Sequence, residues 1–338
     1  MPSVGPASLS VLDLAPVATG STPGDALRRS IELAQHVERL GYLRHWVAEH
    51  HNMPGIASSA PAVLIAHLAT ATTTLRVGSG GVMLPNHAPL VVAEQFGTLE
   101  ALHPGRIDLG IGRAPGTDQI TAYALRRSQD PAADDLPKLL SELRAYFRGT
   151  HPRIHATPGE GDEPAIWLLG SSDFSARLAA SLGLPFSFAH HFMPANTLGA
   201  LELYRSGFVP SADLDAPYAS IGVHVVVADT DERARWLHAP GGLSFLRLRR
   251  GRPGRFPSPE EAAAYEYTPA ERQFVDDWTA SHVVGSPETV RRELIELQQR
   301  TGADELIVTT MVHDPADRLR SYELLAEAVS DADSAQAA

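Results

Sequence analysis

The alternation of β-type and helical segments along the chain is the feature that most constrains its fold. Short apolar runs alternate with longer amphipathic segments at helical spacing, from "LSVLDL" (9–14) to "ELIVTTMV" (305–312). Eight such β runs and eight main helices fit an α/β fold of the (β/α)8 barrel type, a TIM barrel, better than a doubly wound sheet. Barrels of this size form one domain, so we expect residues 1–338 to be a single barrel domain.

The rhythm breaks between residues 239 and 285, after the seventh strand–helix unit. We expect irregular structure there, because its part "RLRRGRPGRFPSP" (247–259) concentrates arginine, glycine and proline. Two interpretations stay open, a solvated loop and an active-site lid that orders over an anionic ligand. The stretch 239–285 is therefore treated as an insertion that could act as a lid and that is disordered without flavin.

The composition excludes several classes of function. The chain has no cysteine and its one lysine is Lys138, which excludes disulfides, thiolate metal sites, a cysteine nucleophile and Schiff-base chemistry at any other lysine. The net charge of −12 disfavours general binding to nucleic acid or to an anionic membrane. No signal peptide is evident, and no apolar run approaches the roughly 20 residues of a membrane span, so we expect a cytoplasmic protein.

Residues that follow neighbouring strands suggest an anion site, because strand ends share one rim in a barrel. Arg113 ends the run "RIDLGIGR", and "GSSDFS", which starts at Gly170, follows the next β run. Ser171 and Ser172 precede an amphipathic helix, where hydroxyls and first-turn amides favour negative charge. An ordinary serine cap would explain the serines equally well, but the neighbouring Arg113 favours a phosphate.

The motif "AEHH" (48–51) ends the second β run with two adjacent histidines, His50 and His51. Successive strand residues point to opposite faces, so only one of the two can readily face the barrel mouth. Neither H-E-x-x-H nor a carboxylate facial triad is legible, and we expect no metal. Glycines at "GSGG" (78–81) weaken a strand unless the backbone bulges or a ligand approaches closely, and both explanations stay open.

Taken together, these segments resemble the luciferase-like flavin-dependent oxidoreductases, the family of bacterial luciferase. The resemblance covers essentially the whole chain and rests on "AEHH", "LRVGSGGVMLPNHAPLVVAEQFGTLEALHPGRIDLGIGRAPG", "GSSDFSARLAASLGLPFSFAHHF" and "GSPETV", in the family's order. The chain looks most like the subgroup that includes antibiotic-biosynthesis monooxygenases. The resemblance implies a TIM barrel with a flavin site at the strand ends.

The resemblance also implies roles for individual residues. It implies a non-prolyl cis peptide at Gly80–Gly81 beside the isoalloxazine ring, acid/base work by His50, and a structural or supporting role for His51. The chain departs from bacterial luciferase at one phosphate position, where a serine replaces a glutamate. The residues implied to hold the flavin phosphate at the ends of the fourth and fifth strands are Arg113, Ser171, Ser172 and Ser175.

The activity implied is that of a two-component monooxygenase. Such an enzyme takes reduced FMN from a separate flavin reductase and uses O2 to oxygenate a small organic substrate, here one of secondary metabolism. One alternative is hydride transfer with F420, whose acidic tail would need a basic groove that the arginine-rich insertion could supply. Another is a non-catalytic flavin-binding protein.

The helical segments after the second and third β runs predict a homodimer. Segments 60–73 and 89–102 carry more apolar residues than one barrel-facing stripe requires.

Overall fold

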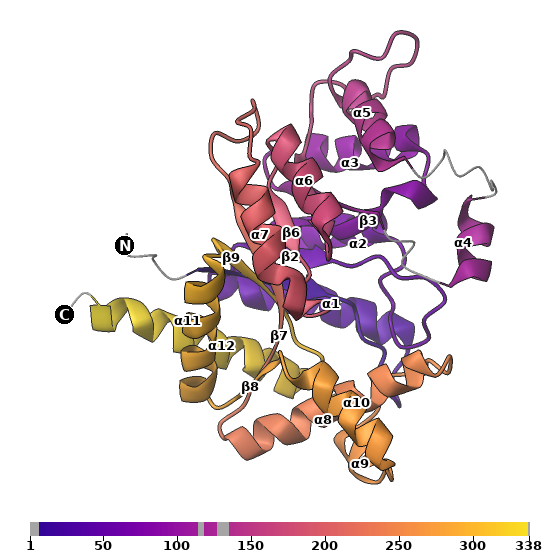
Figure 1. Cartoon of the computed structure of the whole chain (residues 1–338). Helices are drawn as coiled ribbons and strands as arrows, with labels where there is room; N and C mark the ends of the chain where they lie inside the picture. The colour runs from indigo at the N-terminus through magenta and orange to yellow at the C-terminus, as the bar shows by residue number, and fades with distance from the viewer. Residues whose placement is uncertain (1–6, 114–117, 127–134, 337–338) are drawn as a thin grey trace.

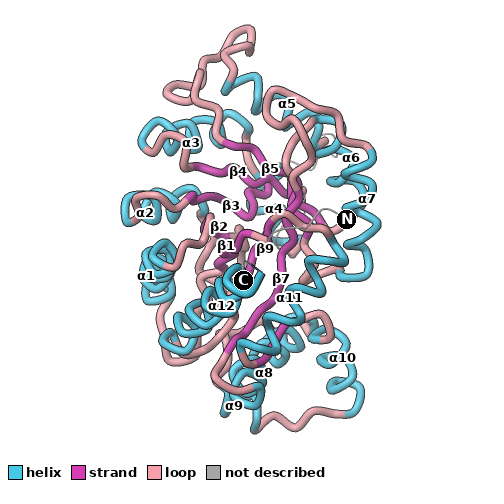
Figure 2. Tube along the Cα trace, turned by 90° about the vertical axis from the view of Figure 1, so that its left-hand side faces the viewer, coloured by secondary structure: helices cyan, strands magenta, loops and turns pink. Residues whose placement is uncertain are grey.

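A closed barrel of eight parallel strands forms the centre of the molecule (Figures 1 and 2). The computed structural model describes residues 7–113, 118–126 and 135–336. The barrel strands are β1 (Ser8–Asp13), β2 (Arg44–Val47), β3 (Arg76–Met83), β4 (Ile107–Gly112), β5 (Ala165–Gly170), β6 (Phe186–Phe188), β7 (Ala219–Val227) and β9 (Glu305–Thr309). They pair in this order, and the ring closes between β9 and β1. The predicted (β/α)8 barrel is thereby confirmed.

Helices follow the strands, and most of them surround the outside of the barrel (Figure 2). They are α1 (Pro23–Arg39), α2 (Pro61–Ala71), α3 (Pro89–Leu102), α4 (Gln119–Arg126), α5 (Leu136–Phe147), α6 (Asp173–Leu182), α7 (Thr197–Ser206), α8 (Asp231–Arg249), α9 (Pro259–Ala263), α10 (Pro269–Thr279), α11 (Pro287–Thr301) and α12 (Pro315–Gln336), with 3-10 turns η1 (Leu84–Asn86) and η3 (Pro194–Asn196). Within the described ranges, none of these helices combines the length and apolar character needed to cross a membrane.

The expectation of irregular structure across 239–285 is wrong, because most of this stretch is helical. Helix α8 continues to Arg249 through an internal Pro240, and α9, α10 and the short strand β8 (Val283–Gly285) follow. Packing explains the result: a Cβ added at Gly242 would lie 2.6 Å from Val275 Cγ1, so the glycine that weakens α8 lets α10 pack against it. These helices form a lobe at the bottom of Figure 1.

The linker between α8 and α9 lies against loops at the C-terminal end of the barrel. Phe256 is buried, and its backbone exchanges hydrogen bonds with Val17 and Thr19 in the loop after β1. Arg255 donates to the Ser21 carbonyl at 2.8 Å. The arginine-rich segment therefore has defined contacts on the loop that follows β1.

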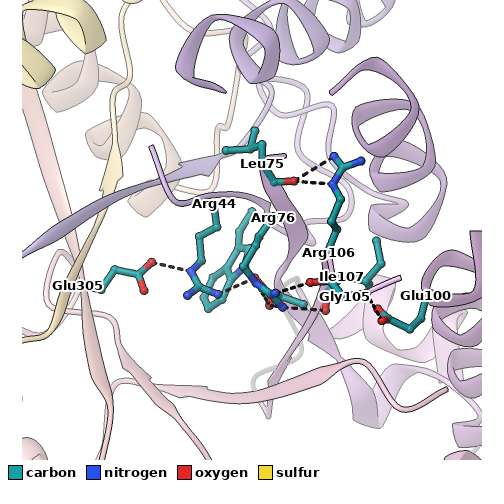
Figure 3. Close-up of polar contacts among 10 residues, drawn as sticks. Arg44, Leu75, Arg76, Glu100, Gly105, Arg106, Ile107 and Glu305 are labelled. Atoms are coloured by element: carbon teal, nitrogen blue, oxygen red, sulfur yellow. Dashed lines mark hydrogen bonds and ion pairs between the residues drawn. The ribbon is translucent and has the colours of Figure 1, made fainter. Parts of the chain in front are cut away.

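A buried ionic layer closes the N-terminal end of the barrel interior (Figure 3). Arg44 donates to Asp108 and to Glu305, each at 2.7 Å, and the side chains of both carboxylates are fully buried. Asp108 also accepts from Trp46 Nε1 at 2.9 Å and from Arg76. Trp46 lies in the next layer, where barrel positions become apolar, so the charged layer forms a floor below the open end.

Candidate active site

A cavity of about 860 Å3 lies at the C-terminal ends of the barrel strands. Strand ends on β2, β3, β4 and β5 and the first turn of α6 contribute to its lining. Every site residue predicted from the sequence lines it: His50, Gly80, Gly81, Arg113, Gly170, Ser171, Ser172 and Ser175. One place in the fold thus brings together residues that are spread over more than 120 positions of sequence.

Only one of the two adjacent histidines lines the cavity, as predicted, although both lie in the loop after β2 and not on the strand. His50 lines the cavity, whereas His51 Nε2 donates to Glu49 Oε1 at 2.9 Å. Glu49 is fully buried and also accepts from His87 Nε2 at 2.8 Å and from the Met83 amide at 3.0 Å. Burial acts to raise the pKa of Glu49, but its hydrogen bonds with His87 and His51 outweigh burial and hold that pKa below its usual value.

The glycines of β3 form a bulge that lines the cavity. The Gly80–Gly81 peptide bond is cis, as the resemblance implied, and the pairing of β3 with β4 shifts register between Gly80 and Val82. A Cβ at Gly81 would lie 2.6 Å from the Gly110 carbonyl oxygen, and one at Gly80 would lie 2.8 Å from Leu12 Cδ1. Only glycine fits at these positions without displacing neighbours. The bulge is confirmed, and close approach of a ligand to it stays a prediction.

The neighbouring part of the rim, after β4 and β5, has the character of an anion site. Ser172 occupies the N-cap position of α6 in an extended conformation, yet its side chain does not cap the helix. A Cβ at Gly170 would lie 2.5 Å from Ser175 Oγ, so glycine is needed for this helix to sit against the end of β5. The Arg113 guanidinium lies 4.4 Å from the centre of the Phe174 ring. Hydroxyls, first-turn amides and a guanidinium therefore border the same cavity.

A third part of the lining, to which the sequence analysis assigned no role, follows β6 and lies on β7 and β9. His191, His224 and Thr309 line the cavity there. His190 lies on the other side of its strand end, with Nδ1 2.8 Å from Thr197 Oγ1. Alternation along "SIGVHVVVA", counted from Gly222, would have assigned His224 to the barrel interior.

A cluster of aromatic side chains lies behind His224. Its ring stacks on His282 with centroids 4.4 Å apart, and His282 Nδ1 shares a 2.8 Å hydrogen bond with His238 Nε2. Burial lowers the pKa of His191 and of His238 to about 4 and that of His282 to about 2, and it holds the pKa of His224 well below its usual value. These imidazoles are neutral at neutral pH.

The buried histidines predict that the folded state loses stability between pH 6.5 and pH 4.5. Their folded pKa values lie below the ordinary value of 6.5, so the unfolded chain binds more protons in this window and gains relative stability as the pH falls. Each such group adds a slope of up to about 1.4 kcal/mol per pH unit. Urea denaturation at half-unit steps of pH should show the free energy of unfolding falling with this slope as the pH is lowered. The slope should be shallower in His282→Phe, and a flat profile in the unmodified protein would contradict the prediction.

Comparisons with known proteins agree with this geometry. Residues 8–305 match the model of the family described as luciferase-like monooxygenase. A luciferase-like monooxygenase of Escherichia coli strain K12 is 48% identical over 94% of this chain and 95% of its own length. An N-acetyl-S-alkylcysteine monooxygenase of Bacillus subtilis strain 168 is 34% identical over 95% of this chain and 98% of its own.

A solved structure extends the match to three dimensions. The crystal structure of apo-MsnO8 superposes with a TM-score of 0.88, at 43% identity, over 96% of this chain and 98% of that one. The family match, the identities over nearly full length and the superposition therefore agree on the barrel fold. This chain belongs to the luciferase-like monooxygenase family and is a monooxygenase.

Proposed function

We propose that the protein binds reduced FMN from a separate flavin reductase and uses O2 to oxygenate a small organic substrate. One observation supports this proposal: a single cavity of about 860 Å3 is lined by the anion site at α6, by the backbone of Gly80 and Gly81, and by His50. That volume lies within the range of cofactor and ligand pockets. Bound reduced flavin would supply the electrons for O2 activation, while the protein orients the reactants and excludes water.

Each part of the site has a proposed task. Arg113 and the serines of the α6 N-terminus, Ser171, Ser172 and Ser175, hold the phosphate by charge-assisted and hydroxyl hydrogen bonds. Gly80 and Gly81 have no side chains, so the isoalloxazine ring of the flavin can lie directly against the backbone of β3. His50 holds or releases a proton at its imidazole on the cavity side.

The charge distribution favours FMN over F420. Among the described residues of the lining, Arg113 is the one arginine or lysine. In the insertion, Arg250 pairs with Glu271 at 2.6 Å and Arg255 donates to the backbone of Ser21. The arginine-rich segment thus contributes no lining residue to the described cavity, and a single guanidinium suits one phosphate better than a long acidic tail.

Binding measurements test the choice of cofactor. We would titrate the protein anaerobically with reduced FMN and with reduced F420, following the fluorescence of tryptophans such as Trp46, which lines the cavity. Reduced FMN should bind tighter than F420. With a flavin reductase and NADH added, O2 uptake should depend on the protein. Tighter binding of F420, with no protein-dependent O2 uptake, would reverse the assignment.

We also propose a homodimer through α2 and α3. The outer faces of these adjacent helices expose Val63 and Val91, and Leu102 at the end of α3 is 68% exposed. Sedimentation velocity should give a dimer in the unmodified protein, and the double variant Val63→Glu/Val91→Glu should sediment as a monomer because two carboxylates would be buried per subunit. Leu198→Glu, an exposed position on α7, is the matched control and should stay dimeric. A concentration-independent monomer before substitution would refute the dimer.

A lid function for part of the insertion remains a proposal. Segment 250–257 lies on the loop after β1, and covering the mouth would keep water from the reduced flavin. Amide hydrogen exchange in this segment should slow when reduced FMN is bound. Phe256→Ala, which removes the buried anchor, should abolish the slowing and raise peroxide release per O2 consumed. Unchanged exchange with intact coupling would identify the segment as an ordinary surface loop.

A further inference from the structure

One corner of the cavity contains buried polar atoms that have no partner within the described structure. They are His224 Nδ1 and Thr309 Oγ1, and beside them lies His191, whose ring contacts the backbone of Gly222. His224 and Thr309 are register partners on β7 and β9, and the His191 and His224 ring centroids are 6.0 Å apart. His191 and Thr309 are only 8% and 1% exposed. Buried polar groups in proteins normally have a hydrogen-bond partner, so the two unpaired groups of His224 and Thr309 beside a cavity point to a ligand that supplies one.

The corner lies across the barrel from the proposed flavin side. In the ring of strands, β7 is four positions from β3 and β9 is four positions from β4. Gly80 and Gly81 lie on β3, and Arg113 follows β4. If the flavin ring lies on β3, as the proposed function requires, a substrate that faces the ring must touch β6, β7 and β9. The inference therefore rests on the proposed function.

The corner has hydrogen-bonding capacity without fixed charge. The two imidazoles have four further histidines near them: His50, His190, His238 and His282. A positive charge on one of these rings lowers the pKa of its neighbours, which disfavours a second charge in the corner. A neutral imidazole donates at one nitrogen and accepts at the other, and a threonine hydroxyl does both.

The charged side chains of the lining have partners or lie elsewhere on the rim. Glu49 is engaged by His51 and His87, and Asp118 accepts from Asn52 at 2.9 Å. Arg113 stacks on Phe174, at the end of β4. A carboxylate or an ammonium group entering the corner would therefore lose its hydration without gaining a counter-charge.

We propose that His191, His224 and Thr309 form the substrate subsite, and that it accepts an uncharged group that both donates and accepts hydrogen bonds, of the carboxamide type. Leu14, Phe188, Phe192 and Ile307 line the same cavity and suit an apolar substrate body. The enzyme would thus select neutral amide-bearing substrates over free acids and amines of the same shape.

Three probes with matched apolar tails test the selection: pentanamide, pentanoate and pentylammonium. Each is titrated into the FMN-loaded protein, with affinity measured by calorimetry and the histidine side-chain nitrogens followed by 15N NMR. Pentanamide should bind at least about fivefold tighter than either ion and should shift the His191 and His224 signals. Absence of pentanamide binding, or pentanoate binding as tight as pentanamide, would overturn the subsite.

Substitutions assign the effect to the corner itself. His224→Phe keeps a ring stacked on His282, and Thr309→Val keeps the side-chain shape. Each should weaken pentanamide about three- to tenfold, the value of one neutral hydrogen bond, and leave pentanoate unchanged. His282→Phe, which changes the same residue type outside the lining, is the control and should bind pentanamide normally.

The controls separate failure of the subsite from failure of the proposed function. Equal loss in His282→Phe and His224→Phe would assign the effect to packing of the cluster and overturn the subsite. Failure of the unmodified protein to bind FMN would refute the proposed function. Normal FMN binding without amide preference would refute the subsite alone.

Discussion

Replacing Arg113 with alanine should weaken FMN binding by about 10- to 150-fold and leave riboflavin binding nearly unchanged. A charge-assisted hydrogen bond to a phosphate contributes about 1.5–3 kcal/mol to binding. Riboflavin has no phosphate and therefore makes no such bond with Arg113. The guanidinium borders the cavity beside the α6 N-terminus, so its removal leaves the glycine wall in place. The measurement is a pair of fluorescence titrations, with FMN and with riboflavin.

A matched control separates local contact from the general field of the helix. Arg177 is exposed on α6 and does not belong to the cavity lining. Arg177→Ala removes the same charge from the same neighbourhood and should change FMN affinity less than about threefold, because exposed charges are strongly screened. If Arg113→Ala lowers the affinity for FMN and for riboflavin equally, Arg113 does not bind the phosphate.

The residues that sequence reasoning found share one property: their chemistry follows from local pattern and strand parity. Alternation of side chains predicted that one of the two adjacent histidines faces the mouth, and the family resemblance selected His50. In the structure His51 pairs with Glu49. Arg113 and Ser172 were found because each follows the C-terminal end of a strand, and all such ends share one rim in a barrel. Parity would also have found His224, which alternates with Gly222 into the cavity.

The features that were not predicted have two causes: a local signal that was outweighed, and a contact between distant segments. The helices of 239–285 were missed because the arginine, glycine and proline of 247–259 outweighed two other signals, the capping boxes formed by Ser258 with Glu261 and by Thr268 with Glu271. Their S/T-x-x-E spacing is legible without a structure. The stacking of His224 on His282 is not, because no pattern places these two rings 4.4 Å apart.

The ionic layer below the cavity leads to the largest expected effect on stability. Arg44→Met should lower the free energy of unfolding by about 3–5 kcal/mol, since it leaves buried carboxylates without their shared cation. Arg44 is 5% exposed and bridges Asp108 and Glu305 (Figure 3). After the substitution Asp108 still accepts from Arg76 at 2.6 Å, but Glu305 keeps only a neutral partner among the described residues, the Tyr218 hydroxyl at 3.0 Å.

Two further variants show whether the buried charge, rather than lost packing, causes the effect. Arg28→Met breaks an exposed ion pair, in which the Arg28 side chain is 68% exposed and the Asp25 side chain 38% exposed. This substitution should change the free energy of unfolding by less than about 1 kcal/mol. The double variant Arg44→Met/Glu305→Gln removes the uncompensated carboxylate and should be more stable than Arg44→Met alone. Urea denaturation of the unmodified protein and of the three variants measures this recovery directly. Arg44→Met no worse than Arg28→Met would mean that water or a second cation reaches Glu305. If the double variant is as unstable as Arg44→Met, the lost stability comes from poor packing of the methionine against Trp46. Removing the Glu305 carboxylate relieves an unpaired charge but does not relieve poor packing.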